Sequence, residues 1–68
     1  MATNNIMLQK KIHDSGLSIT FIANKTGITR QTLYNRFDGI GEWNASEIVA
    51  MTNVLRLTRA ERDSIFLS

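Results

Sequence analysis

The chain lacks cysteine and proline, has a single histidine and contains no long apolar run. The absence of cysteine excludes a disulfide framework and a thiolate zinc site. No apolar stretch approaches the roughly 18 residues of a membrane span, and the N-terminus has no signal-peptide core. These absences predict a cytoplasmic protein with no membrane partner.

The sequence contains none of the combinations of residues that commonly carry out catalysis. The sequence offers no paired carboxylates and no Ser-His-Asp or Cys-His arrangement, and His13 stands without other metal ligands. The stretch Gly39-Ile40-Gly41 lacks the third glycine and the preceding strand of a phosphate-binding loop. A core this small leaves no room for a deep pocket. We therefore expect no enzyme activity, no cofactor, no metal and no small-molecule substrate.

What remains is one small domain of 68 residues, 43% hydrophobic and 21% charged. A chain of this size buries only about 60% of its unfolded surface, so dimerisation would help its stability. Residues 1–5 are expected to form a mobile tail that leads into the first helix.

Positive charge is concentrated in the stretch 18–37, which contains no acidic residue. Lys25, Arg30 and Arg36 give this stretch a charge of +3, whereas the whole chain carries +2. An acidic band of Asp38, Glu42 and Glu47 follows directly. This distribution is a better indication of nucleic-acid binding than the net charge.

Capping residues and apolar spacing predict five short helices, at about 5–15, 19–26, 30–38, 45–55 and 59–67. The second helix competes with a strand, because residues 19–22 are all β-branched or aromatic. Ser18 as a helix cap and Gly27 as a helix end favour the helix. The expected fold class is therefore all-α, a compact bundle of five helices.

The last predicted helix ends in three consecutive apolar residues, Ile65, Phe66 and Leu67, which cannot all face inward. They either close the core or form a contact with a second copy or another protein. The sequence leaves both interpretations open.

The predicted helix 30–38 has an unusual outer face. Leu33 and Phe37 share one side and must point to the core. The opposite side presents amide and hydroxyl groups, with Arg30 in the exposed first turn. Solvated helices usually mix lysine with glutamate, whereas a polar helix without acidic groups is typical of one that enters the DNA major groove.

The spacing Ala-x-x-x-Gly-Ile-x-x-x-x-Leu, formed by Ala23, Gly27, Ile28 and Leu33, resembles the helix-turn-helix motif of Cro/CI-like (XRE-type) regulators from phages and mobile elements of Gram-positive bacteria. Small Ala23 lets the next helix cross closely, and Gly27 takes the positive φ of the turn. Ile28 and Leu33 fill the angle between the helices. The resemblance covers roughly residues 6–57 and implies a lambda-repressor-like DNA-binding domain acting in a bacterial host cell.

The resemblance also implies roles for individual residues. The base readers would be Arg30, Gln31 and Asn35, with Thr32 and Tyr34 as helpers. Arginine suits guanine, the amides suit adenine, and a threonine methyl suits thymine. The phosphate contacts would be Thr20, Lys25, Thr29 and Arg36. The implied partner is a double-stranded DNA operator, bound by a homodimer.

Three positions depart from the family's pattern. Ile19 replaces a glutamine that commonly grips phosphate, and Arg36 replaces an apolar residue whose core role Phe37 takes over. The loop 39–43, often basic in the family, contributes Glu42 instead, and phosphate contacts supply most of the affinity for DNA. The sequence therefore predicts first a Cro-like transcriptional regulator. The alternative is an antirepressor or modulator that binds a partner repressor protein through a surface formed by Ile40, Trp43, Ile65, Phe66 and Leu67.

Overall fold

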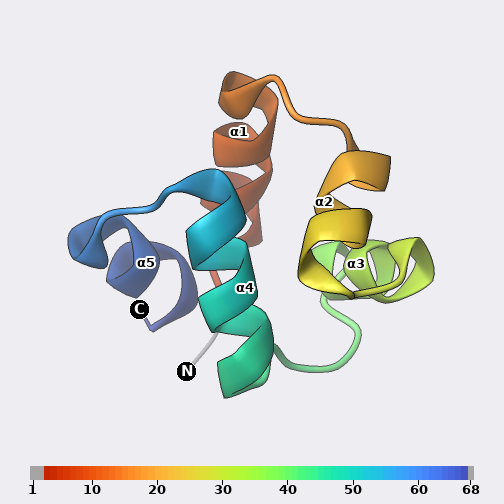
Figure 1. Ribbon diagram of the computed structural model, residues 1–68. Coiled ribbons are helices and arrows are strands. Elements are labelled where there is room, and N and C mark those ends of the chain that lie inside the picture. The colour runs from red at the N-terminus through yellow and green to blue at the C-terminus, as the bar shows by residue number, and fades with distance from the viewer. Residues whose placement is uncertain (1–2, 68) are drawn as a thin grey trace.

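The computed structural model describes residues 3–67, which form five α-helices and no strand. The helices are α1 (Asn5–Ser15), α2 (Ile19–Thr26), α3 (Arg30–Phe37), α4 (Ala45–Leu55) and α5 (Arg59–Phe66). In Figure 1, α4 lies in the middle of the molecule, with α5 on one side and α2 and α3 on the other. The predicted all-α class is confirmed, and the predicted helix bounds are met within one residue.

Side-chain caps begin the helices where the sequence predicted them. Ser18 accepts a hydrogen bond from the Phe21 N–H at 3.1 Å, which starts α2 across the β-prone residues. Asn44 with Glu47, and Thr58 with Glu61, form complete capping boxes at α4 and α5. Each such cap stabilises its helix by about 1 kcal/mol, enough to outweigh the weak strand preference of residues 19–22.

Residues 4 and 5 do not form the mobile tail that the sequence predicted for residues 1–5. Asn4 caps α1 by accepting a hydrogen bond from the Met7 N–H, and its own N–H donates to the Ile65 carbonyl at 2.7 Å. Asn5 is the first residue of α1. Residues 4 and 5, predicted to belong to a mobile tail, are instead part of the fold and tie α1 to α5. Residues 1 and 2 lie outside the described part of the chain.

The core receives one fully buried side chain from each helix: Leu8, Ile22, Leu33, Met51 and Ile65. Truncating one of these to alanine typically costs about 2–5 kcal/mol of stability. Because every helix contributes to the same core, the orientation of α3 depends on the packing of the whole bundle.

The C-terminal cluster divides between core and surface. Ile65 is fully buried and Phe66 is 4% exposed, whereas Leu67 follows the helix and is 44% exposed. The α5 helix therefore closes the core. Ile65 and Phe66, predicted as part of a protein interface, are buried inside the fold, where α5 packs against α1 and α4.

Candidate nucleic-acid interface

The turn between α2 and α3 has the geometry that the four packing residues predict. Gly27 adopts a left-handed conformation (φ 75°), and its N–H donates to the Ala23 carbonyl at 2.9 Å. Ile28 and Leu33 are buried, and Ala23 is partly buried against the same core. The Thr26 hydroxyl closes the turn by donating to the Ile22 carbonyl at 2.7 Å. The turn thus holds α3 in one orientation against α2.

The outer face of α3 presents hydrogen-bonding groups to solvent. Arg30, Gln31 and Tyr34 are exposed, and Asn35 is half-buried. Gln31 Nε2 donates to Asn35 Oδ1 at 3.1 Å, so the two amides, one turn apart, hold each other in place. This bond leaves the Gln31 carbonyl oxygen and the Asn35 amino group free. The centre of the face therefore carries one acceptor and one donor group in a fixed relation beside the Arg30 guanidinium.

The two helper residues lie on opposite edges of α3. Thr32 lies toward the start of α4, in a shallow hollow that Asn44 and Ser46 also line. Tyr34 lies toward α1, with its ring edge-on to Phe37 at 6.3 Å between centroids. Together they widen the polar face of α3, and the Glu47 carboxylate, 14% exposed, lines the hollow beside Thr32.

A hollow of about 390 Å³ lies where the start of α3 meets α2. It is lined by two of the predicted phosphate contacts, Thr20 and Thr29, together with Arg30 and Asn24. The Thr29 hydroxyl is already engaged, because it donates to Thr32 and caps α3, so this residue offers backbone N–H groups rather than a side chain. The prediction missed Asn24, although its position one turn after Thr20 places both on the same side of α2.

Lys25 lies apart from this hollow. Its ammonium nitrogen is 5.6 Å from the centroid of the Phe21 ring, on the side of α2 that faces α4. This cation–π contact draws the side chain along α2 and away from Thr29 and Arg30. The structure therefore does not bring Lys25 together with the other predicted phosphate contacts.

Arg36 is the clearest correction to the predicted site. Its side chain is 20% exposed, its Nη1 donates to the Ile40 carbonyl at 3.2 Å, and its Nε lies 3.7 Å from Glu47 Oε1. Glu47 in turn caps α4. Arg36 was predicted to contact phosphate, but it is used internally to tie the end of α3 to α4, because the loop 39–43 folds back over it.

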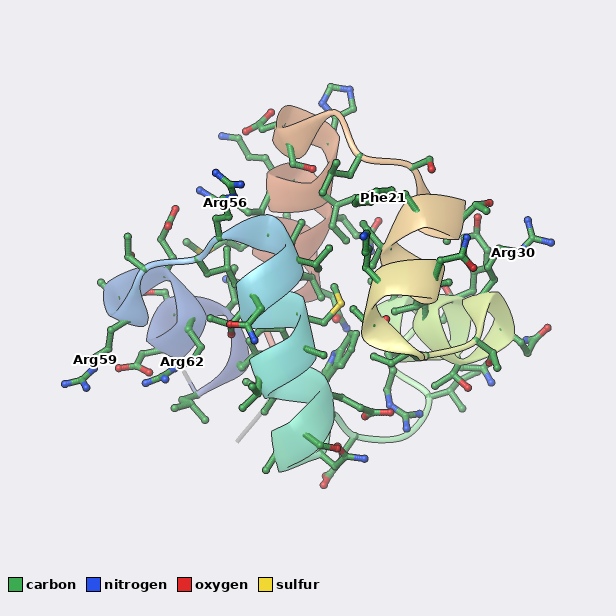
Figure 2. All side chains as sticks on the ribbon, in the orientation of Figure 1. Phe21, Arg30, Arg56, Arg59 and Arg62 are labelled. Atoms are coloured by element: carbon green, nitrogen blue, oxygen red, sulfur yellow. The ribbon has the colours of Figure 1, made fainter. Side chains whose placement is uncertain are left out.

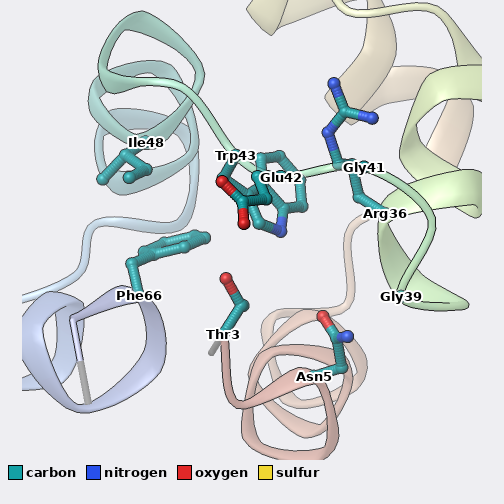
Figure 3. A pocket seen from close by; sticks show the side chains of 9 residues that line it. All are labelled: Thr3, Asn5, Arg36, Gly39, Gly41, Glu42, Trp43, Ile48 and Phe66. Atoms are coloured by element: carbon teal, nitrogen blue, oxygen red, sulfur yellow. The ribbon is translucent and has the colours of Figure 1, made fainter. Parts of the chain in front are cut away.

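Behind this loop lies a cavity of about 470 Å³ (Figure 3). Trp43 packs against Phe66 (5.4 Å between ring centroids) and Phe37 (6.4 Å), which is why it is half-buried. Its indole nitrogen points into the cavity toward Asn5, and neither Trp43 Nε1 nor Asn5 Oδ1 has a hydrogen-bond partner among the described residues. The Trp43 side of the loop is therefore anchored by aromatic packing, whereas Ile40 is held by hydrogen bonds with the Arg36 guanidinium and the Asn35 carbonyl.

Of the five residues predicted for a protein interface, Ile40 and Leu67 are exposed, at 59% and 44%, and Trp43 is half-buried. With Ile65 and Phe66 in the core, no continuous apolar surface joins the loop to the end of α5 through these residues. The structure brings the predicted base readers together but does not assemble the predicted protein interface.

No family model, no curated protein and no solved structure matches this chain. None of the helices among residues 3–67 is long and apolar enough to cross a membrane. The same residues contain no group of three histidine, aspartate or glutamate side chains that could hold a metal ion.

Proposed function

We propose that this protein is a sequence-specific DNA-binding transcriptional regulator, similar to Cro, that inserts α3 into the major groove of an operator in the cytoplasm of a bacterial host cell. The observation that carries the proposal is the outer face of α3, where Arg30, Gln31 and Asn35 lie within two turns of a helix that contains no acidic residue from 30 to 37. The resemblance of the turn and its four packing residues to Cro/CI-like regulators supports the same function.

Each group on this face has a base that it fits. The Arg30 guanidinium can donate two hydrogen bonds to O6 and N7 of guanine, a contact that discriminates by about 1–3 kcal/mol. The Gln31–Asn35 pair retains an acceptor and a donor, which matches N6 and N7 of adenine. The backbone N–H groups at the start of α3 and the side chains of Thr20 and Asn24 would contact phosphates and set the orientation of α3.

The supply of phosphate contacts favours a dimer. Arg36 is engaged internally and Lys25 faces α4, so one copy offers few cations to the backbone of the duplex. Binding through two copies doubles these contacts and places two α3 helices one turn of DNA apart, about 34 Å. We therefore expect the protein to bind a two-fold operator as a homodimer.

The decisive experiment selects binding sites from a random duplex library and compares variants on the selected sequence. Arg30→Ala is expected to weaken binding to that sequence by about 5- to 150-fold, which corresponds to the loss of one bidentate base contact. Arg59→Ala is the matched control, because Arg59 is an exposed arginine on α5, on the other side of the molecule from Arg30 (Figure 2). Fluorescence anisotropy at several salt concentrations gives both affinities.

Two results would contradict this function. The first is that no duplex is enriched and no salt-dependent binding is seen. The second is that Arg30→Ala and Arg59→Ala weaken binding equally, which would mean that only net charge matters.

A second function, modulation of a partner repressor, is favoured by the surroundings of α3. The helix is followed by exposed acidic residues, Asp38 and Glu42, and by exposed Ile40. In this alternative the protein binds the repressor encoded beside its own gene, and Ile40→Ser disrupts the complex. If the two purified proteins do not associate, this alternative fails.

A further inference from the structure

A groove of about 510 Å³ runs between α2 and α4, on a side of the molecule that the proposed DNA contact does not use. Phe21 and Lys25 contribute from α2, and Val49, Ala50, Val54 and Arg56 from α4 and its end. In Figure 2 the Phe21 side chain points from α2 toward the groove, whereas Arg30 extends away from the molecule on the opposite side of α2. A partner in the groove and a duplex against α3 would therefore not compete for the same residues.

The centre of the groove is apolar and uncovered. Val49 is 58% exposed and Phe21 is 41% exposed, although both are side chains that favour burial. On α4, Val49, Ala50 and Asn53 follow helical spacing and form one outward face. This face is not needed for the core, which α4 reaches through Met51 and Leu55.

The rim of the groove is positively charged. Lys25 comes from the last turn of α2, with its ammonium over the Phe21 ring, and Arg56 comes from the end of α4. The two helices run in roughly opposite directions (Figure 1). Within residues 3–67, no acidic side chain lines the groove. Glu47, the acidic residue of α4, is only 14% exposed and lies against Arg36 on another side.

Arg56 adds an independent observation. It ends α4 in a left-handed conformation (φ 54°), whereas Gly16, Gly27, Gly39 and Gly41 supply the other positive φ angles among residues 3–67. Its backbone N–H donates to the Asn53 and Thr52 carbonyls, so the turn is closed by the backbone and does not use the side chain. The Arg56 side chain is exposed, lines the groove and forms no ion pair within residues 3–67.

We propose that this groove binds a segment of a partner protein that is acidic and carries apolar side chains at helical spacing. Apolar anchors would fill the space between Phe21 and Val49, and carboxylates would meet Lys25 and Arg56. A second copy of this chain fits less well, because two-fold docking of the groove on itself would oppose like charges without an acid to separate them. The proposal does not depend on DNA binding.

The test is a titration of the protein with a synthetic amphipathic peptide, monitored by two-dimensional amide NMR. The peptide carries leucine at i, i+4 and i+7 and glutamate at the flanking positions. Chemical-shift changes are expected at Phe21, Val49, Asn53 and Arg56. A control peptide has glutamine in place of every glutamate. Loss of two exposed ion pairs should weaken its binding by up to about 30-fold, given at most about 1 kcal/mol for each pair.

A matched pair of variants locates the site. Val49→Glu should abolish peptide binding, and Ile40→Glu should leave it unchanged, although the two positions are equally exposed at 58% and 59%. The double variant Lys25→Glu/Arg56→Glu should no longer bind the glutamate peptide. It should instead bind a peptide in which every glutamate is replaced by lysine. Arg56→Gly keeps the left-handed turn and removes the charged side chain, so its amide spectrum should remain that of the folded protein while its affinity for the glutamate peptide falls.

Several outcomes would overturn the proposal. Equal effects of Val49→Glu and Ile40→Glu, or shift changes that map outside α2 and α4, would place binding elsewhere. Equal binding of the glutamate and glutamine peptides would remove the acidic preference. If ultracentrifugation shows a dimer that Val49→Glu dissociates, a second copy occupies the groove. If the selection experiment finds no DNA sequence, the proposed DNA-binding function fails, but the peptide proposal does not. The titration contains no DNA and tests the groove separately.

Discussion

The two ends of α3 carry one arginine each, and the two arginines have opposite surroundings. Arg30 is exposed at the first turn and forms no ion pair within residues 3–67. Arg36 is 20% exposed, donates to the Ile40 carbonyl and lies beside Glu47. The same type of residue is therefore exposed to solvent at one end of the helix and fixes the other end to the bundle.

The difference arises from the segment that lies next to each arginine. The turn before Arg30 is completed by hydrogen bonds of the backbone with threonine hydroxyls. The Arg30 guanidinium is therefore not needed to hold this turn. The loop after Arg36 folds over it: Gly41 takes φ 77°, and a Cβ atom there would lie 3.2 Å from the Arg36 Cζ. A glycine at this place thus makes room for the guanidinium, which in turn holds the loop.

The largest effect that tests this comparison is expected from Gly41→Ala, measured against Gly39→Ala. Both glycines have positive φ (77° and 83°), so each substitution should lose about 1 kcal/mol in backbone energy. Only position 41 also displaces Arg36 from the Ile40 carbonyl, which adds about 1 kcal/mol for the lost hydrogen bond. Urea unfolding gives both free energies.

A double-mutant cycle sharpens this prediction. In an Arg36→Ala background the extra cost of Gly41→Ala should disappear, since no guanidinium remains to be displaced. If Gly39→Ala and Gly41→Ala cost the same in the wild-type background, Arg36 does not occupy the space beside Gly41.

The next effect compares the arginines directly. Arg36→Ala should lower the free energy of unfolding by about 1–2 kcal/mol, because it removes a hydrogen bond and leaves the Glu47 carboxylate, 14% exposed, without its cation. Arg30→Ala should change stability by less than about 0.5 kcal/mol, as expected for an exposed residue without partners. Thermal unfolding of the two variants measures the contrast. Equal losses of stability would mean that Arg36 is no more structural than Arg30.

A smaller effect concerns the loop that Arg36 supports. Trp43→Phe keeps an aromatic ring against Phe66 and removes an indole N–H that has no partner among the described residues. The smaller ring buries less apolar area, which destabilises the fold, whereas removal of the unpaired N–H stabilises it. Because the two effects oppose each other, stability should change by less than about 1 kcal/mol. Trp43→Ala also removes the ring, which is partly buried against the core, and should cost about 1–2 kcal/mol. A large loss for Trp43→Phe would show that the N–H is hydrogen-bonded in solution.

Most of the fold could be predicted because its signals are local. Ser18, Thr29, Asn44 and Thr58 each cap a helix with their own side chain, and Gly27 ends one with its own φ angle. Such interactions span three or four residues and are legible in the sequence. The same holds for the two sides of α3, since helical periodicity alone sets Leu33 inward and Gln31 outward.

The errors concern contacts between distant segments. Arg36 is engaged by a residue eleven positions later, Glu47, and Asn4 bonds to Ile65 across the whole chain. Ile65 and Phe66 fill a core that forms only when α1 and α4 are in place. Helical periodicity and capping rules do not predict contacts between distant segments. The sequence alone therefore does not distinguish an exposed polar residue from one that holds the fold together.

The smallest expected effect is pH-dependent and lies far from α3, at the ion pair of Lys11 in α1 with Glu61 in α5. The hydrogen bond from the Lys11 ammonium, followed by the Thr58 backbone N–H, lowers the pKa of the Glu61 carboxyl below its ordinary value. A carboxyl whose pKa is lower in the folded state stabilises the fold above its ordinary pKa, and this contribution is lost as the pH falls through the folded value. Lys11→Met should therefore lower the melting temperature near neutral pH, and the difference from wild type should shrink as Glu61 becomes protonated. The control Glu61→Gln should remove the effect of Lys11→Met at every pH.

Since the pair joins only α1 to α5, Lys11→Met should leave the selected DNA sequence unchanged. An altered sequence preference would mean that the exposed start of α3 depends on the far side of the bundle.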